Sequence, residues 1–419
     1  MHLRGPVPLH DADSLTNREA AWWSNATGRP IVRLLRAHQS AAPDEFVETI
    51  AYAIMGIGGR DVVLFLIDYA HVELTPHPDV LPHRDEPDVA SLDGSMAGRA
   101  FTSQRALAVE REDGWHVWVP VSDRADRLGV LAMTLPAWDE DTEACCVEIG
   151  LAAAPLLTAS AQYTDLPHLL RRCHRMDLPA EMQWALLPPL SFSAAGASIA
   201  GLLEPAYEVG GDCFDYAYNS GRLDFAMFDM VGHGLRSAVL AALVVGAYRY
   251  GRRAGEDLPE LADTIDAAVR THPGTVAFAT GVLGRLDATT GRLSWMACGH
   301  PLPLIARAGS ILAAAAGRPG LPLGMGGFGS VRGDVVEVDL EPGDGVLLYT
   351  DGVTEARTPN GDFFGEERLR DLLAREHGAG DSPQEVVRRL VRTTIEHSAD
   401  AGLRDDASML YIHWSGTPD

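Results

Sequence analysis

The spacing of apolar residues divides the chain into three regions with different patterns. In the first region, a helical spacing over Phe46–Met55 ends at Gly56, and a second helix is expected over about Thr142–Ser160. Between them lie three strand-like runs separated by turns that contain Asp and Gly: Val62–Ile67, Trp115–Val121 and Leu128–Thr134. These elements predict an α+β domain over residues 31–161, preceded by a poorly ordered or loosely docked arm at residues 1–30.

The second region, residues 162–189, carries two short helical patterns, each opened by the same Asp-Leu-Pro sequence. Asp165 and Asp177 are expected to cap these helices, and Pro167 and Pro179 lie in the first turn, where a missing N–H group costs little. Helices this short are not stable alone in water, so their apolar stripe must pack against the next domain or a second copy of the chain. The stripe comprises Leu166, Leu169, Leu170, Cys173, Met176, Leu178, Met182, Leu186 and Leu187.

The third region, residues 190–419, is rich in strands with pairs of helices between them. Helices are expected after Gly234, Leu258 and Glu366 and at Ser382–Glu385, which has the pattern of a capping box. Strands joined by short loops, with helix pairs between them, predict two packed sheets flanked by helices. The expected strands are Leu223–Phe228, Val276–Leu286, Leu293–Cys298, Leu302–Ala306, Val335–Leu340, Val346–Tyr349 and Ser408–His413.

Composition excludes several classes of partner. The 419 residues include 34 basic and 58 acidic ones, and a net charge of −24 disfavours nucleic acid and anionic membranes. The apolar run Ala238–Tyr248 is shorter than the roughly 20 residues that span a membrane. The five cysteines show no metal-site spacing and fit a reducing compartment. We therefore expect a cytoplasmic protein.

Four aspartates in the third region share one placement, where a strand meets a loop. Asp229 and Asp351 each end an expected strand, Asp405 precedes one, and Asp212 follows Gly210–Gly211. Each of them alone is readily explained as a turn residue. Strand ends on one edge of a sandwich can nevertheless converge, so together the four indicate a cluster of carboxylates.

Clustered carboxylates repel one another and resist burial unless a cation neutralises them. Ligation by oxygen alone favours Mg²⁺ or Mn²⁺ over Zn²⁺. Two such ions that share a carboxylate can hold a water between them, lower its pKa and place it for in-line attack on phosphorus. The acidic set therefore suggests metal-dependent hydrolysis of a phosphoester.

The segments that hold these aspartates resemble, in order and spacing, the PPM (protein phosphatase 2C-like) family of metal-dependent serine/threonine phosphatases, in its bacterial SpoIIE branch. Four motifs carry the resemblance: Glu208–Asp215 (EVGGDCFD), Phe228–Gly234 (FDMVGHG), Leu348–Ala356 (LYTDGVTEA) and Arg404–Ser408 (RDDAS). Further landmarks of the branch are Trp184–Pro188 (WALLP), Cys298–Pro301 (CGHP) and Gly320–Met325 (GLPLGM), so the resemblance covers about residues 180–415.

The resemblance implies an αββα sandwich that binds two Mn²⁺ or Mg²⁺ ions. Asp229 would bridge the ions, with the Met230 carbonyl as a further ligand. Asp351 and Asp405 would hold one ion, and Asp212 would act on the other. The branch acts on regulators of sigma factors, which implies a phosphoserine or phosphothreonine substrate on a STAS-domain anti-anti-sigma protein.

Several neighbouring residues have other roles in this scheme. Asp406 is the alternative to Asp405, whereas Asp215 and Glu355 are expected to orient loops. The family's usual aromatic after the first aspartate is replaced here by Cys213, and Met230–Val231 replaces small residues. No acidic position is lost, so we expect an active enzyme.

Three further residues have chemistry that the motifs leave open. His233 could protonate the leaving oxygen of a phosphoserine or simply stabilise its loop. Cys298 and His300 lie two residues apart and could suggest a thiol nucleophile, but no activating partner is visible. A packing role is expected for this pair.

The first region resembles a GAF domain at Ser95–Phe101 (SMAGRAF) and Arg127–Leu131 (RLGVL). GAF domains bind small molecules or dimerise, so the resemblance implies a sensory domain over residues 31–161 and a homodimer. Two alternatives stay open: a non-catalytic dimeric module on a phosphatase fold, and a metal-dependent hydrolase of small phosphoesters. The complete acidic set argues against the first, and the missing Gly-Lys phosphate loop against the second.

Overall fold

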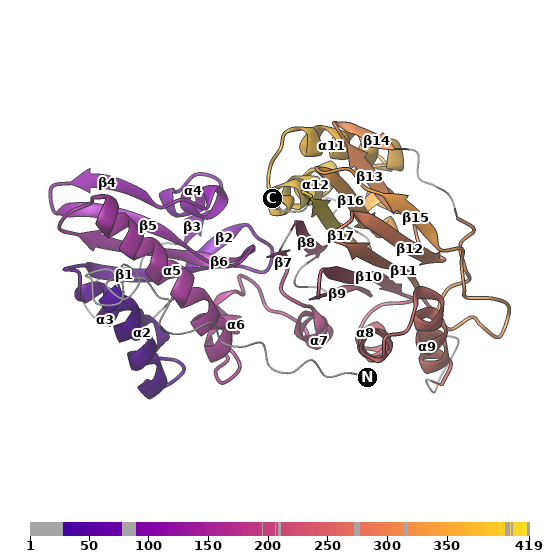
Figure 1. Ribbon diagram of the computed structural model, residues 1–419, viewed down its shortest axis with the longest axis horizontal. Coiled ribbons are helices and arrows are strands. Elements are labelled where there is room, and N and C mark those ends of the chain that lie inside the picture. Colours follow the sequence, from indigo (N-terminus) through magenta and orange to yellow (C-terminus); the bar gives the residue numbers. More distant parts are fainter. Residues whose placement is uncertain are drawn as a thin grey trace. The chain divides into compact units, whose positions relative to one another are not determined.

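The computed structural model describes residues 28–77, 89–194, 196–205, 207, 211–271, 277–312, 317–398, 403 and 405–416. The chain forms two compact units, one that ends at Cys173 and one that begins at His174 and includes Arg124–Asp126 (Figure 1). Their boundary falls inside the expected connector, residues 162–189. Residues 1–27 of the expected arm lie outside the described residues, and the last three residues of that arm already belong to helix α2.

The first unit contains a six-stranded sheet in the order β3-β2-β1-β6-β5-β4. Alternate residues of β1 face opposite sides of this sheet. Val62 and Leu64 pack with the helices α2 (Gly28–Ser40), α3 (Phe46–Met55) and α5 (Glu140–Ser160), while Val63 and Phe65 pack with α4 (Met96–Ser103). The strands are β1 (Arg60–Ile67), β2 (Glu73–Pro76), β3 (Ala90–Ser91), β4 (Leu107–Arg111), β5 (Gly114–Asp123) and β6 (Asp126–Leu135).

Among the described residues, α5 is the one helix long and apolar enough to cross a membrane by length and composition. Its buried side chains, among them Cys146, Ile149 and Ala153, belong to the core of the first unit. A core helix of a soluble protein passes the same test, so length and composition point only weakly to a membrane span. The expectation from the sequence rested on Ala238–Tyr248 alone and missed this helix.

The expected connector forms the helices α6 (Leu166–Leu170) and α7 (Leu178–Leu186). The predicted cap of α7 is confirmed, because the Asp177 side chain accepts a hydrogen bond from the Ala180 N–H group at 3.2 Å. The predicted cap of α6 is wrong. Asp165 already has helical backbone angles (φ −79°, ψ −9°), so its side chain makes no capping bond to the N–H groups of the first turn.

The second unit is built on two antiparallel sheets packed face to face, with one large apolar core between them. The five-stranded sheet has the order β15-β12-β11-β10-β9, and the six-stranded sheet has the order β14-β13-β16-β17-β8-β7. The strands are β7 (Ser191–Ala194), β8 (Ala197–Glu204), β9 (Asp212–Asn219), β10 (Arg222–Met230), β11 (Ala279–Asp287), β12 (Arg292–Cys298), β13 (Leu304–Arg307), β14 (Ser310–Leu312), β15 (Val336–Asp339), β16 (Asp344–Tyr349) and β17 (Ala407–Trp414).

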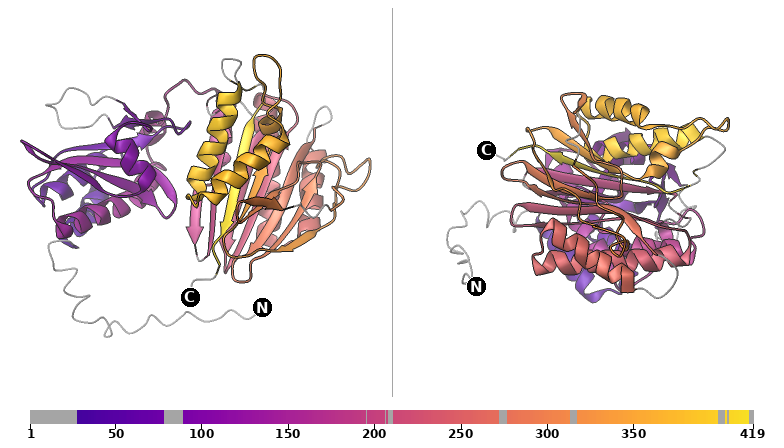
Figure 2. Two further views of the ribbon diagram at one scale, coloured as in Figure 1. Left: turned by 90° about the horizontal axis from the view of Figure 1, so that it is seen from above. Right: turned by 90° about the vertical axis from the view of Figure 1, so that its right-hand side faces the viewer.

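Helices cover the outer faces of both sheets. The helices α8 (Leu235–Ala254) and α9 (Leu258–Thr271) pack on the five-stranded sheet, and α11 (Glu366–Gly378) and α12 (Pro383–Ser398) pack on the six-stranded one. The right-hand view of Figure 2 shows these four layers edge-on. The single-turn helix α10 (Asp351–Glu355) follows β16. The predicted αββα sandwich is thus confirmed for this unit.

Candidate active site

Two of the expected aspartates lie on neighbouring strands of the five-stranded sheet. Asp212 begins β9, Asp229 lies one residue before the end of β10, and the antiparallel register places them directly opposite each other. Both share the strand face of Phe214 and Met227, which pack between the two sheets. The two carboxylates therefore lie on the inner face of the sandwich at its edge.

The other two aspartates reach the same edge from the six-stranded sheet. Asp351 directly follows Thr350 at the end of β16, and Asp405 precedes the start of β17. These two strand ends are adjacent because Tyr349 pairs with Met409. We call the group of Asp212, Asp229, Asp351 and Asp405 the acidic edge.

The charges of these residues act on one another. Burial, followed by the charges of Asp351 and Asp405, raises the pKa of Asp229 to about 7. Burial and the charge of Asp405 likewise raise the pKa of Asp351. A proton or a cation is therefore favoured at this edge.

A buried hydrogen-bond network lies beneath the acidic edge. The Thr350 hydroxyl donates to Asp212 Oδ2 at 2.7 Å and accepts from the Ser408 N–H group at 3.0 Å. Asp406, which is 8% exposed, accepts from the backbone N–H group of Asp212 at 3.2 Å. Asp406 thus fixes the start of β9, while Asp405 is exposed and interacts with Asp229 and Asp351. This arrangement favours Asp405 over Asp406 as a ligand.

Close backbone packing brings the Met230 carbonyl near Gly211. The Met230 N–H group donates to the Gly211 carbonyl at 3.2 Å, and a Cβ atom at position 211 would lie only 2.5 Å from the Met230 carbonyl oxygen. A side chain at position 211 is therefore excluded. The Met230 side chain is buried under the helices α8 and α9, so its backbone is the part available to the acidic edge.

The acidic edge offers only oxygen donors. Within the described ranges, no three His, Cys, Asp or Glu side chains are already arranged to hold an ion, and Asp212 is turned toward Thr350. The donor chemistry nevertheless fits a hard divalent cation, since carboxylates and one carbonyl are the ligands that Mg²⁺ and Mn²⁺ prefer.

The remaining motif residues have other surroundings, and after burial and the charge of Asp405 the charge of Glu355 also contributes to raising the pKa of Asp351. Asp215 is buried on β9 and pairs with Arg249 at 2.9 Å and Arg252 at 3.0 Å, both on α8. Glu355 and His233 are exposed at the end of α10 and in the loop before α8. Asp215 therefore ties the sheet to its helix layer.

Cys298 cannot serve as a ready nucleophile. Burial raises the pKa of its thiol to about 12, and Sγ donates to the Val331 carbonyl at 3.3 Å. The ring of His300 is hydrogen-bonded to Thr280. These contacts favour the packing role expected for Cys298.

Two polar partners of Asp212 were not expected from the sequence. Thr350 precedes Asp351 directly in the motif, so its position could have pointed to a supporting role. Gln183 on α7 donates from Nε2 to the Asp212 backbone carbonyl, and no sequence signal indicated this contact.

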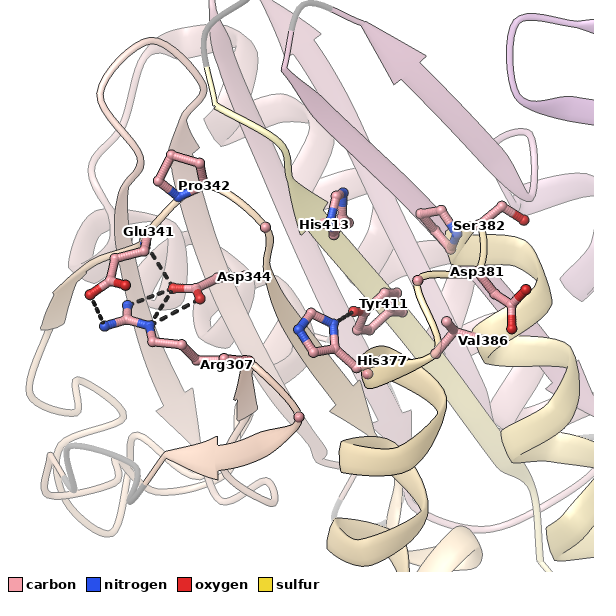
Figure 3. Close-up of a pocket in the computed structure, with 16 residues that line it drawn as sticks. Arg307, Glu341, Pro342, Asp344, His377, Asp381, Ser382, Val386, Tyr411 and His413 are labelled. Atoms are coloured by element: carbon pink, nitrogen blue, oxygen red, sulfur yellow. Dashed lines mark hydrogen bonds and ion pairs between the residues drawn. The ribbon is translucent and has the colours of Figure 1, made fainter.

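A separate pocket of about 710 Å³ lies at the opposite ends of β16 and β17 (Figure 3). Its lining residues include Asp344, which accepts from Arg307 Nε at 3.0 Å, and Tyr411, whose hydroxyl lies 2.7 Å from His377 Nδ1. β16 runs from this pocket to the acidic edge, about 17 Å for its length at the usual rise per residue. The pocket is therefore distinct from the acidic edge.

Comparison with known proteins shows what the second unit is similar to. Residues 219–415 match the family model for Stage II sporulation protein E (SpoIIE). The chain is 26% identical over 246 residues to Protein IcfG of Synechocystis, which covers 51% of this chain but only 37% of that protein. It is 23% identical over 239 residues to Phosphoserine phosphatase RsbU of Bacillus subtilis, covering 57% of this chain and 69% of that protein.

Among solved structures, the chain is similar to the RsbU and RsbW domains of Rv1364c from Mycobacterium tuberculosis. The match has 29% identity and a TM-score of 0.46, and it covers 55% of this chain and 63% of the other. The region that matches the family model contains Asp229, Asp351 and Asp405 and ends before residue 416. The match to the SpoIIE family model over residues 219–415 agrees with the resemblance that the motifs indicated for this part of the chain.

Proposed function

We propose that this protein is a metal-dependent protein serine/threonine phosphatase whose catalytic centre is the acidic edge. The observation that carries the proposal is the convergence of two aspartates from each sheet on one edge of the sandwich. The similarity to a phosphoserine phosphatase over 239 residues supports it. Together, the acidic edge and this similarity favour hydrolysis of a phosphoester.

In this proposal Asp229 would serve both ions, and the Met230 carbonyl would be a further ligand. Asp351 and Asp405 would hold one ion, and Asp212 would act on the other. When bound, Mn²⁺ or Mg²⁺ would neutralise the phosphoryl oxygens and acidify a water for in-line attack. The residues of the chain would position the ions and the phosphoryl group. Because the pKa of Asp229 is raised to about 7, a proton and a cation compete for this carboxylate near neutral pH.

The buried network supplies the rigidity that such a centre needs. Thr350 holds the Asp212 carboxylate, and Asp406 holds the Asp212 backbone, so the first ligand strand is fixed from two directions. His233 is exposed close to Asp229 in sequence. It is a candidate to protonate the leaving oxygen.

The substrate we propose is a phosphoserine or phosphothreonine on a STAS-domain anti-anti-sigma protein in the cytoplasm. The similarity to SpoIIE and RsbU supports this choice by analogy. The net charge of −24 is consistent with it, since nucleic acid and anionic lipid would be repelled.

We further propose that the first unit is a GAF-like sensor and that the chain forms a homodimer. The contact of Gln183 with Asp212 supports a regulatory link, because it joins α7 of the connector directly to the acidic edge. Leu169 and Leu178 are 55% and 62% exposed, as expected of an apolar stripe that a second chain covers.

The test is hydrolysis of p-nitrophenyl phosphate and of a phosphorylated STAS protein with Mn²⁺, with and without chelator. We expect metal-dependent hydrolysis of both and loss of both in Asp229→Ala. Asp263→Ala, a change at an exposed aspartate on α9, is the matched control and should retain activity. Hydrolysis of neither compound would favour the non-catalytic module, and hydrolysis of small phosphoesters alone would favour the second alternative.

A further inference from the structure

The chain passes from one sheet to the other beside the acidic edge. β12 belongs to the five-stranded sheet and β13 to the six-stranded one, and residues 299–303 connect them. A bridge between Gly281 and Gly299 holds the start of this crossing against β11. The crossing segment therefore touches both sheets where the aspartates converge.

His300 lies in this segment and is only 5% exposed. Its Nδ1 atom is 2.7 Å from the Thr280 hydroxyl. Thr280 lies directly opposite Asp229 in the register of β10 and β11. The imidazole is thus linked to the cross-strand neighbour of the central aspartate.

The second ring nitrogen has different surroundings. His300 Nε2 is buried and has no hydrogen-bond partner among the described residues. Burial lowers the pKa of the ring to about 4, and the Tyr349 backbone counteracts part of this effect, as a nearby carbonyl does. Tyr349 ends β16, two residues before Asp351. The ring is therefore neutral near pH 7 and lies between the supports of Asp229 and Asp351.

Only one tautomer satisfies both neighbours. If the Thr280 hydroxyl donates to Nδ1, the proton is on Nε2 and can be donated to the Tyr349 carbonyl. The other tautomer would direct a lone pair toward that carbonyl oxygen, which is repulsive. A buried polar group without a partner is costly, so this position favours the tautomer with the proton on Nε2.

We propose that His300 is a positioning residue that joins the two sheets at the acidic edge, through Thr280 on one side and the Tyr349 carbonyl on the other. It thereby sets the separation of Asp229 and Asp351. The inference rests on the proposed function, because it assigns His300 a role in preparing the acidic edge for divalent ions. Outer partners that orient metal ligands change metal affinity by about 10- to 100-fold when they are removed.

The experiment measures Mn²⁺ affinity directly from the paramagnetic resonance signal of the free ion, without reference to catalysis. The variants are His300→Phe, which keeps a ring without nitrogens, and Thr280→Val, which removes the hydroxyl at constant shape. We expect each to bind Mn²⁺ about 10-fold more weakly. The double variant should bind Mn²⁺ no more weakly than His300→Phe, since the two changes remove the same connection.

His300→Gln should recover most of the affinity, because its amide can accept from Thr280 and donate to Tyr349. His413→Phe is the matched control: this histidine lies on β17 at the distant pocket and should alter melting temperature without altering Mn²⁺ affinity. If His300→Phe does not fold, the Mn²⁺ affinity of Thr280→Val tests the inference.

Wild-type affinity in both His300→Phe and Thr280→Val would overturn the inference and leave the proposed function standing. A wild-type protein that does not bind Mn²⁺ at all would overturn both. A third outcome also contradicts the inference: His300→Phe binds Mn²⁺ more weakly, His300→Gln does not restore the affinity, and Thr280→Val binds as the wild type does. His300 would then be a packing residue.

Discussion

Replacement of Asp229 by asparagine is expected to stabilise the metal-free protein at pH 8. The pKa of Asp229 is raised from 3.8 to about 7 by burial and by neighbouring carboxylates. A raised folded-state pKa means that the ionised carboxylate destabilises the fold. The cost is absent below the unfolded-state pKa near 4, grows as the pH rises, and is complete above about pH 7.

The shift of about three pKa units corresponds to an upper value of about 4 kcal/mol at 1.36 kcal/mol per unit. Solvent screening at this partly exposed group reduces the figure, and we expect about 2 kcal/mol. For a unit of this size the melting temperature should rise by about 4–8 °C at pH 8 in the presence of chelator. At pH 4 the variant and the wild type should melt alike.

Thermal unfolding followed by circular dichroism, in chelator at pH 4 and pH 8, measures this difference. Asp224→Asn is the control, because Asp224 lies buried on the same strand and pairs with Arg222 at 3.0 Å and Arg285 at 2.8 Å. That change should lower the melting temperature at pH 8, where the ion pairs are formed. An unchanged or lowered melting temperature for Asp229→Asn at pH 8 would refute the electrostatic reasoning.

Three further expectations concern other parts of the chain. Cys298→Ala should keep full phosphatase activity, and iodoacetamide should not inhibit the native enzyme. The reason is that the pKa of the buried Cys298 thiol is raised to about 12. Loss of activity in either assay would indicate a chemical role for this thiol. Asp215→Ala should lower the free energy of unfolding in urea by about 3 kcal/mol, since Arg249 and Arg252 lose their partner, yet leave Mn²⁺ affinity unchanged. Leu169→Asp should convert a dimer to a monomer by light scattering, because this exposed leucine lies on the connector stripe; equal masses would exclude the stripe as the dimer contact.

The strands that end at the acidic edge were predictable because their apolar runs are long and end in Asp-Gly turns or loops. β10 and β16 lie within two residues of the expected ranges at their carboxyl ends. The strand β9 was not predicted, since DCFDYAYN mixes acidic and aromatic residues and its burial depends on the helix α8 packed over it. Consequently, the direct pairing of Asp212 with Asp229 became visible only in the structure.

The supporting residues of the site were less accessible from the sequence. The adjacent residues Asp405 and Asp406 cannot be told apart from the motif alone. In the structure, Asp406 accepts a hydrogen bond from the Asp212 backbone, whereas Asp405 is exposed. The position of His300 between the sheets depends on a chain crossing that no local pattern reveals. The periodicity of apolar residues indicates which side of a helix or strand is buried, but it does not indicate which distant residues meet. Asp212 and Asp406, for example, are in contact although they are more than 100 positions apart in the sequence.

The most direct test of the account compares the release of phosphate from a phosphoserine protein by the wild type and by Asp229→Asn at saturating Mn²⁺. If the acidic edge is the catalytic centre, the variant should be at least as stable as the wild type in chelator and yet lose about 1,000-fold in rate, roughly 4 kcal/mol of transition-state stabilisation. A folded Asp229→Asn protein that releases phosphate at the wild-type rate would contradict the assignment of the acidic edge as the centre of a metal-dependent phosphatase.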